Sequence, residues 1–304
     1  MTAVPHTDLT NPVVPAVTDE PRDLTPRGMA WRRFRSNRMA VVGLVILGLL
    51  VLAVLVGPLL YRVDPNAVDP LNYRKPPGVG GPLGSDSAGR DVLARLLVGG
   101  RISLTIGLCS AAIATAIGIV LGVVSGYFRG RVDGVLTRAA EVFQTFPTLI
   151  IIIVIVALVG SSLPVLILGL GLLQWTQAYR VSRSVTMGLR EQDSVLAIDG
   201  LGGSSGYILR KHLVPAVLPH ATVAFTLLMA TVVMTEAGLS FLGLGVPPPT
   251  SSWGGMITEA QQLTILRSMP WMWAPPGIAI AVTILAVNFV GDGLRDAVDP
   301  RQAR

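Results

Sequence analysis

Six apolar runs dominate the pattern of hydrophobic and polar positions along the chain. They are rich in Val, Ile, Leu, Ala and Gly, and polar or Pro- and Gly-rich segments separate them. The runs cover residues 39–60, 102–126, 139–159, 163–181, 216–238 and 275–292. Because a helix needs about 20 apolar residues to cross a bilayer, each run predicts one spanning helix. The predicted fold is an all-α membrane protein with six transmembrane helices.

A polar, arginine-bearing segment, residues 182–215, separates the fourth run from the fifth. It is much longer than the usual connection of roughly 4–6 residues. Gly202 and Gly203 can adopt the backbone angles of a turn, and Ser204 or Ser205 can cap a following helix. Three apolar residues fall on one face of that helix, namely Ile208, Leu209 and Leu213. The pattern predicts two short helices joined by a glycine hinge.

Basic residues gather on the segments that a cytoplasmic N-terminus would place inside the cell. Residues 1–38, 127–138, 180–215 and 295–304 hold 17 of the 24 Lys and Arg. The long outer segment 61–101 holds six of the other seven. Long segments cross the membrane largely regardless of charge, so this one says little about orientation. The distribution predicts that both termini are cytoplasmic.

The runs divide the chain into five parts. They are a cytoplasmic tail with a basic juxtamembrane segment (1–38), the first transmembrane helix (39–60), an extracytoplasmic segment (61–101), a core domain of five helices including 182–215 (102–294), and a cytoplasmic tail (295–304). Residues 1–28 contain five prolines and show no period, which is typical of a disordered tail. The basic, aromatic stretch 31–38 is expected at the lipid headgroups.

Two outer segments have recognisable local patterns. Apolar positions within 92–97 form one face of an interfacial helix at the end of the first segment. The second segment, 239–274, contains three consecutive prolines, which forbid regular helix at that point. We predict a rigid loop there. Its tryptophans, Trp253, Trp271 and Trp273, are expected near the membrane surface.

Composition supports a membrane protein and excludes several other classes. The chain is 51% hydrophobic and 14% charged, whereas soluble domains carry about 25% charged residues. The net charge of +6 is explained by positive-inside segments and does not indicate nucleic-acid binding. The single cysteine, Cys109, cannot form an internal disulfide. No G-x-x-x-x-G-K-[ST] phosphate loop is present, and no histidine has metal-ligand spacing, so the sequence implies no cofactor.

Polar residues within the apolar runs are the first candidates for function. Glu236 ends the fifth run, where it either binds a substrate amino group or holds the 239–254 loop. Asn288 either lines a polar path or bonds between helices. Glu141 lies three residues after Arg138, which favours a surface ion pair.

Small residues in the second run predict close helix packing. Gly118, Gly122 and Gly126 recur every four residues, so they fall on one face of a helix. Small side chains at this spacing allow two membrane helices to approach each other closely.

An intramembrane serine protease is an alternative from a different class of protein. Gly238-Leu239-Ser240 superficially resembles a serine nucleophile site, with His220 as its base. Twenty helical residues would separate Ser240 from His220 by about 30 Å, far beyond hydrogen-bond reach. The sequence therefore favours a protein that is not an enzyme.

Three ordered stretches resemble the C-type permease subunit (OppC/DppC-like) of bacterial oligopeptide, dipeptide and nickel ABC importers. Residues 81–91 are similar to the family's PLGTDxxGRDV pattern. Residues 236–254 are similar to EAxLSFLGLGxxPPxPSWG, and residues 288–300 to NxxGDGLRDxLDP. The resemblance covers most of residues 81–301 and implies the type I ABC importer permease fold.

In that family the segment 182–215 is the coupling loop, with a signature that begins Glu-Ala-Ala and ends at a proline. Aligned on Pro215, this chain matches at Ala197 and Gly202 but has Leu196 in place of the glutamate. The remaining candidates for the missing negative charge are Asp193 and Asp199. The resemblance implies coupling to an ATPase through Leu196, Ala197, Ile198, Asp199, Gly202, Gly203 and Pro215.

The resemblance also implies a function and partners. The chain would be a peptide permease that works with a second permease subunit (OppB/DppB-like), two ABC ATPase subunits, an extracytoplasmic substrate-binding protein and membrane lipid. Candidate contacts with the binding protein are Asp86, Arg90, Asp91, Pro248 and Trp253. Candidate residues of the translocation path are Glu236 and Asn288. The alternatives are a permease for nickel complexes or another small solute, and a passive channel or scaffold without an ATPase.

Overall fold

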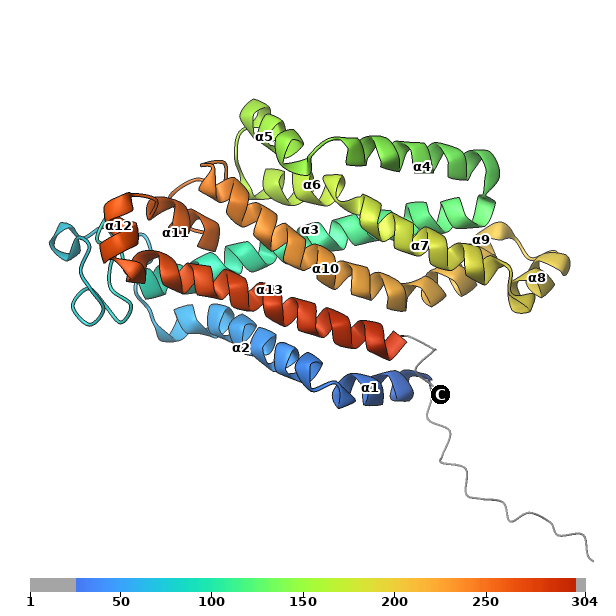
Figure 1. Cartoon of the computed structure of the whole chain (residues 1–304), viewed down its shortest axis with the longest axis horizontal. Helices are drawn as coiled ribbons and strands as arrows, with labels where there is room; N and C mark the ends of the chain where they lie inside the picture. Colours follow the sequence, from blue (N-terminus) through green and yellow to red (C-terminus); the bar gives the residue numbers. More distant parts are fainter. Residues whose placement is uncertain (1–25, 299–304) are drawn as a thin grey trace, which may run out of the picture.

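The structure, a computed structural model, describes residues 26–298 and is built of helices (Figure 1). The helices are α1 (Pro26–Ser36), α2 (Arg38–Leu60), η1 (Pro70–Asn72), α3 (Val92–Phe128), α4 (Gly130–Thr145), α5 (Thr148–Val159), α6 (Leu163–Leu173), α7 (Trp175–Arg190), α8 (Asp193–Gly200), α9 (Ser205–Ile208), η2 (Leu209–Leu213), α10 (Val214–Phe241), α11 (Trp253–Glu259), α12 (Leu263–Ser268) and α13 (Pro270–Val298). The described part contains no β-strand, only an isolated bridge between Ser85 and Asp91. Residues 1–25 of the tail predicted for 1–28, and residues 299–304, lie outside the described residues, whereas residues 26–28 are helical because α1 begins at Pro26.

Four helices are long and apolar enough to cross a membrane, and a bent pair makes a fifth candidate. The four are α2, α3, α13 and the continuous helical stretch Ser205–Phe241, which joins α9, η2 and α10. The bent pair is α4 and α5, whose axes differ by 79°. The all-α membrane fold is therefore as predicted, although the count of six spans is only approximate.

Two of the predicted spans are interrupted. The run 139–159 is divided between α4 and α5, because Pro147 follows Phe146 and a residue before proline disfavours the helical conformation. The run 163–181 is divided at Gln174, which ends α6 and begins α7. The apolar halves, α5 and α6, pack against each other, whereas α4 and α7 carry the charged residues.

The predicted interfacial helix at 92–97 is the first part of α3 and not a separate element. α3 has 37 residues, so it is about 55 Å long and exceeds the roughly 30 Å of a bilayer core. Gly99 and Gly100 do not break the helix. A Cβ on Gly100 would come within 2.7 Å of the Trp253 ring, so these glycines make room for the segment that contains α11.

The packing of α3 on α7 confirms the prediction from the glycine spacing. Cβ atoms placed on Gly118, Gly122 and Gly126 would come within 2.5, 2.6 and 2.7 Å of side chains on α7. Those side chains are themselves small and recur every four residues, namely Ala178, Ser182 and Thr186. The two small-residue faces let the backbones of α3 and α7 approach closely.

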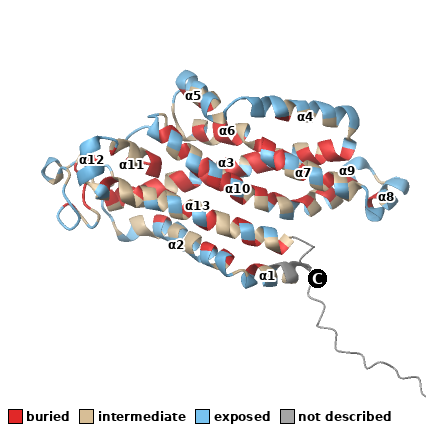
Figure 2. Ribbon diagram, in the orientation of Figure 1, coloured by how far each residue is buried: buried red, intermediate tan, exposed pale blue. Residues whose placement is uncertain are grey.

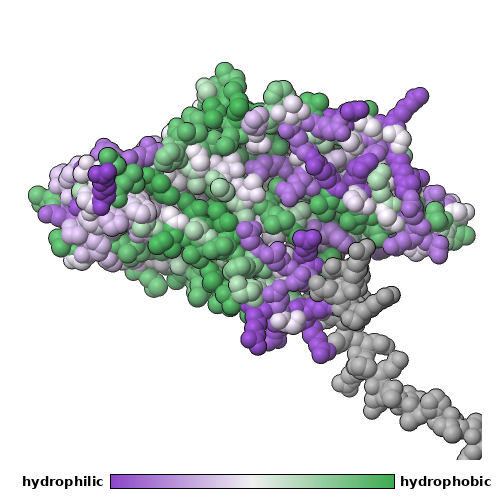
Figure 3. All heavy atoms as spheres, in the orientation of Figure 1, coloured by the Kyte–Doolittle hydropathy of each residue, from purple (hydrophilic) through white to green (hydrophobic). Residues whose placement is uncertain are grey.

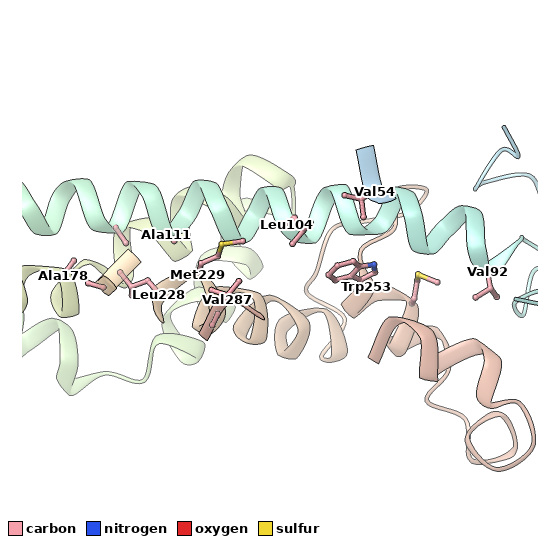
Figure 4. Close-up of a cluster of buried hydrophobic side chains, with 13 residues drawn as sticks. Val54, Val92, Leu104, Ala111, Ala178, Leu228, Met229, Trp253 and Val287 are labelled. Atoms are coloured by element: carbon pink, nitrogen blue, oxygen red, sulfur yellow. The ribbon is translucent and has the colours of Figure 1, made fainter. Parts of the chain in front are cut away.

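The main buried cluster lies along α3 and unites α2, α7, α10, α11 and α13 (Figure 4). Buried positions concentrate on the facing sides of α3, α7 and α10, whereas α4, α5 and α2 are largely exposed (Figure 2). The exposed surface is apolar in a belt between two hydrophilic ends (Figure 3). α2 contributes Leu49, Leu52 and Leu55 to that belt, each more than half exposed, as expected for a lipid-facing helix.

The segment 239–274 contains more helix than predicted. The prolines 247–249 lie outside helices, but α11 and α12 form within the segment and α13 begins at Pro270. Trp253 does not lie at a membrane surface: it is 1% exposed and packs in the main cluster, where its indole N–H donates to the Leu96 carbonyl oxygen at 2.9 Å. The loop thus folds back into the bundle, and the tryptophan is part of its core.

Candidate functional site

The end of the molecule that carries α8 contains the predicted glycine hinge. Gly202 has φ +83°, a left-handed conformation that favours glycine. Its N–H donates to the Asp199 carbonyl oxygen at 3.0 Å, and the Gly203 N–H donates to that of Ile198 at 2.9 Å. A Cβ on Gly203 would lie 2.6 Å from the Ile198 side chain. Both glycines are therefore required, one by its backbone angle and the other by its close contact.

The helix after the hinge is anchored as its sequence predicts. Ser204 is the N-cap of α9 and accepts from the Tyr207 N–H at 3.4 Å. Ile208 and Leu213 are buried in a cluster with Val195, and this cluster includes residues of α3 and α10. Helix continues without interruption from Ser205 to Phe241. A displacement of α8 would consequently reach α10 through the packing of Val195 against the continuous helix that begins at Ser205.

The hinge presents an apolar face to the surroundings. Leu196 is 53% exposed and Leu201 is 89% exposed, and Ala197 is exposed beside them. Ile198 is turned inward and packs against the Val195 cluster. Asp199 is exposed, as is Pro215 at the start of α10. Leu201 was missed by the sequence analysis because the family signature does not include it, although it lies four positions after Ala197 and so on the same side of α8.

Two ion pairs fix the helices around this end. Arg183 of α7 donates to Asp133 of α4 at 2.6 Å, and Arg129 donates to Glu191 at 2.6 Å. The first pair joins α7 to α4, and the second joins the α3–α4 connection to the α7–α8 connection. The predicted surface pair of Arg138 and Glu141 also forms, at 2.9 Å, and both of its side chains are exposed.

A charged cluster occupies the opposite end of the molecule. Arg90 contacts Asp86 at 2.8 Å and Glu259 at 2.7 Å. Arg95, which is 3% exposed, also binds both of these acids and donates to Ser251 at 3.0 Å. The cluster joins the segment before α3 to α11. Arg95 and Glu259 were not singled out from the sequence, because their pairing spans 164 positions.

The predicted binding-protein contacts at this end differ in accessibility. Asp86 and Trp253 are buried. Asp91 caps α3 by accepting from the Ala94 N–H at 2.8 Å, and also accepts from the Tyr61 hydroxyl at 2.8 Å. Arg90 is partly exposed, and Pro248 is exposed. Only these last two, together with part of Asp91, present surface that an external protein could reach.

Glu236 is fully buried between α10, α3 and the loop before α11. It accepts from Ser240 at 2.8 Å and from Ser103 at 3.3 Å. Ser103 in turn accepts from the Trp253 N–H at 3.1 Å. Of the two roles weighed from the sequence, holding the 239–254 loop agrees with these contacts. Asn288 is half-buried on α13. Among residues 26–298, no group of three or more His, Cys, Asp or Glu could hold a metal ion.

The apolar belt and the long packed helices define a multi-pass membrane protein. The sequence model of the binding-protein-dependent transport system inner membrane component matches residues 118–304. A second sequence model, of the N-terminal TM domain of oligopeptide transport permease C, matches residues 25–77. The chain belongs to this family of inner-membrane transport permeases, whose members work within ABC importer complexes.

Relatives of the chain carry consistent names. A putative peptide permease protein of Brucella ovis is 39% identical over 92% of this chain and 93% of its own length. The oligopeptide transport system permease protein OppC of Bacillus subtilis is 38% identical over 90% of this chain and 88% of its own. The dipeptide transport system permease protein DppC of the same species is 36% identical over 90% and 86%.

Proposed function

We propose that the chain is one of two permease subunits of an ATP-driven importer of short peptides. The relatives named above support peptides as cargo. The observation that carries the coupling part is the exposed apolar surface of α8, which a glycine turn joins to the continuous helix that contains α10. An exposed face of this kind indicates a docking surface for another protein. The sequence has no phosphate loop, so the partner at this face supplies the ATP hydrolysis.

In this proposal, two ATPases close on ATP and displace α8 in each permease. Leu196, Leu201 and Ala197 contact the ATPase, and the cluster around Val195 and Ile208 transmits the displacement to α10. Because α10 packs on both α3 and α13, its movement rearranges the helices that face the second permease. A binding protein delivers the peptide at the opposite end, where Arg90 and Pro248 offer accessible surface.

The proposal is tested by reconstitution. The chain is co-expressed with a second permease and two ATPase subunits, and the purified complex is placed in proteoliposomes with a binding protein and ATP. We expect accumulation of short peptides that depends on every component, and no ATP hydrolysis by this chain alone. Uptake that proceeds without the ATPases would contradict the proposal and favour a passive channel.

The orientation can be tested with single cysteines in a Cys109→Ala background. Thr250 and Ser205 are both exposed and lie at opposite ends of the α9–α10 helical stretch, since Ser205 begins it and Thr250 follows it in the loop before α11. In intact cells, the Thr250→Cys variant should react with a membrane-impermeant maleimide, and the Ser205→Cys variant should react only after permeabilisation. Reaction of both in intact cells would contradict a cytoplasmic hinge. The buried Ser252 would be a poor choice, because a cysteine there would be unreactive in either orientation.

Replacing Gly202 by Val is expected to uncouple ATP hydrolysis from transport. A β-branched residue at φ +83° is strongly disfavoured, by roughly 1–2 kcal/mol or more, so α8 would leave its orientation. We expect peptide uptake per ATP hydrolysed to fall about tenfold, with normal insertion in the membrane.

Gly200→Val is the matched control for this substitution. Gly200 lies two positions away, at the end of α8, and an added Cβ would meet nothing within 4 Å at either position. Its φ is not in the left-handed region, so the control differs only in backbone conformation. Equal coupling in the two variants would show that Gly202 is not a hinge.

A further inference from the structure

A cavity of about 560 Å³ lies between α7, α10 and α13, and the proposed function does not account for it. Its volume falls within the range of roughly 300–1,000 Å³ that is typical of small-molecule sites. The polar lining consists of Gln177, His220, Asp292 and Arg295. Val223, Ala224 and Leu227 of α10 supply an apolar wall. Asp292 and Arg295 belong to the motif at residues 288–300, to which neither the hinge nor the charged cluster gives a role.

The charged groups of this cavity have no partner within residues 26–298. Asp292 and Arg295 are exposed, and neither makes a hydrogen bond or ion pair there. Their spacing does not prevent pairing, because Arg138 and Glu141 are also three positions apart on a helix and contact at 2.9 Å. Asp296 on the same helix does have a partner, because its carboxylate accepts a hydrogen bond from the Asn37 side chain at 2.9 Å. The Nδ1 atom of His220 is buried without a partner as well.

We propose that this cavity binds a zwitterionic peptide of about two residues on its way through the permease. Asp292 pairs with the α-ammonium group, Arg295 pairs with the α-carboxylate, and the Gln177 amide bonds to the peptide backbone. The apolar wall at Leu227 favours apolar side chains of the peptide, because a charged side chain would lose its hydration there without gaining a partner. The proposal deepens the function inferred above and rests on peptides being the cargo.

The spacing of the two charges favours short peptides. Residues three apart on a helix have Cβ atoms about 5–6 Å apart. Two extended peptide residues span at most about 7 Å, so the ends of a dipeptide can reach both Asp292 and Arg295. A longer extended peptide can satisfy only one of the two charges.

The exposure of both charges makes the binding weak, which suits a site that must release its ligand. An exposed ion pair changes an equilibrium constant by only about 1.4- to 5-fold. A second cavity of about 290 Å³ lies on the other side of Gln177, which lines both. The second cavity lies at the two helix interruptions and is lined by Gln144 and Gln174. Its uncharged amides extend the polar lining along α7.

The test measures peptide binding directly, separately from transport. Leu227 is 37% exposed and lines the cavity, so Leu227→Cys in the Cys109→Ala background reports occupancy through its rate of alkylation. The full chain in lipid nanodiscs is treated with a maleimide in the presence of dialanine, N-acetyl-dialanine or dialanine amide. Dialanine should slow alkylation, and each blocked form should protect about 1.4- to 5-fold less well.

Charge variants assign each end of the peptide. Asp292→Asn should remove the preference for a free ammonium group, and Arg295→Gln should remove the preference for a free carboxylate. Asp296→Asn is the matched control on the same helix, because this carboxylate binds Asn37, and it should keep both preferences. The site would be overturned if the three ligands protected the cysteine equally or if dialanine gave no protection. It would also be overturned if the Asp296→Asn control lost both preferences.

Failure of the site and failure of the proposed function give different results. Peptide transport by the reconstituted importer, with no protection of the Leu227→Cys variant by dialanine, would reject this site and leave the importer standing. Selective protection in the full chain without peptide transport by the complex would instead reject the proposed cargo pathway.

Discussion

Replacing Gly122 by Val is expected to leave little folded protein in the membrane. A Cβ at this position would lie 2.6 Å from the Ser182 Cβ atom and 2.6 Å from the Tyr179 carbonyl oxygen. The second of these is backbone and cannot move without shifting α7. Forcing extra atoms into a packed interface typically costs about 1–3 kcal/mol, and we expect at least the upper end here. The yield of monodisperse protein and its thermal midpoint in detergent provide the measurement.

Gly188→Val controls for the loss of a glycine from a helix of the same pair. Gly188 lies on α7, and an added Cβ there would meet nothing within 4 Å. The control should be recovered at the level of the unmodified chain. If both variants were recovered equally well, the close approach of α3 and α7 would not be important for stability. Gly118 and Gly126 provide independent repeats of the same experiment, one turn away on either side.

The sequence predicted the features that depend on local patterns. The apolar runs located the long helices, since composition alone decides whether a helix can be surrounded by lipid. The glycine spacing predicted the face of α3 that packs on α7, and Ser204 was one of the two caps considered for α9. Each of these predictions needed only residues within a few turns of one another.

The features that escaped prediction depend on contacts between distant segments. Trp253 was expected near lipid because tryptophan is common at interfaces, but Gly100 leaves space that its ring fills. Arg95 was counted only as a positive charge, although it is buried between two acids. No proline or glycine stands at Gln174 to indicate the interruption, so the run 163–181 predicted one continuous helix.

Two long helices, α3 and α10, run between the two ends of the molecule. α10 begins at the hinge cluster and ends near Glu236, whose serine contacts hold the loop before α11. That loop also leads into the Arg90–Arg95 cluster through Glu259. A displacement at α8 would therefore pass through the Val195 cluster to α10, and along α10 to the end proposed to meet the binding protein. The zwitterion cavity lies on the same helix, at His220 and Leu227.

The side chains around the hinge indicate which contacts hold the proposed ATPase. The family signature has a glutamate where this chain has Leu196, so this position carries no charge for a partner to contact. Asp199 is exposed and could supply the charge instead, three residues along. Leu196 and Leu201 are also exposed, while Ile198 is turned inward, so the apolar contact rests on the two leucines. The free energies expected for an apolar contact and for an exposed ion pair decide which of the two contributes more to binding the ATPase.

Leu196→Asp is expected to weaken association with the ATPase subunits more than Asp199→Asn does. Burying a leucine contributes roughly 1.5–3 kcal/mol, equivalent to about 10- to 100-fold in affinity, whereas an exposed ion pair contributes about 0–1 kcal/mol. We would measure co-purification of the ATPases with each variant over a range of salt concentrations. Association of the unmodified chain should persist at high salt, because apolar contacts are not screened. If Asp199→Asn released the ATPases and Leu196→Asp did not, docking would depend on charge, and Asp199 would have taken over the role of the missing glutamate.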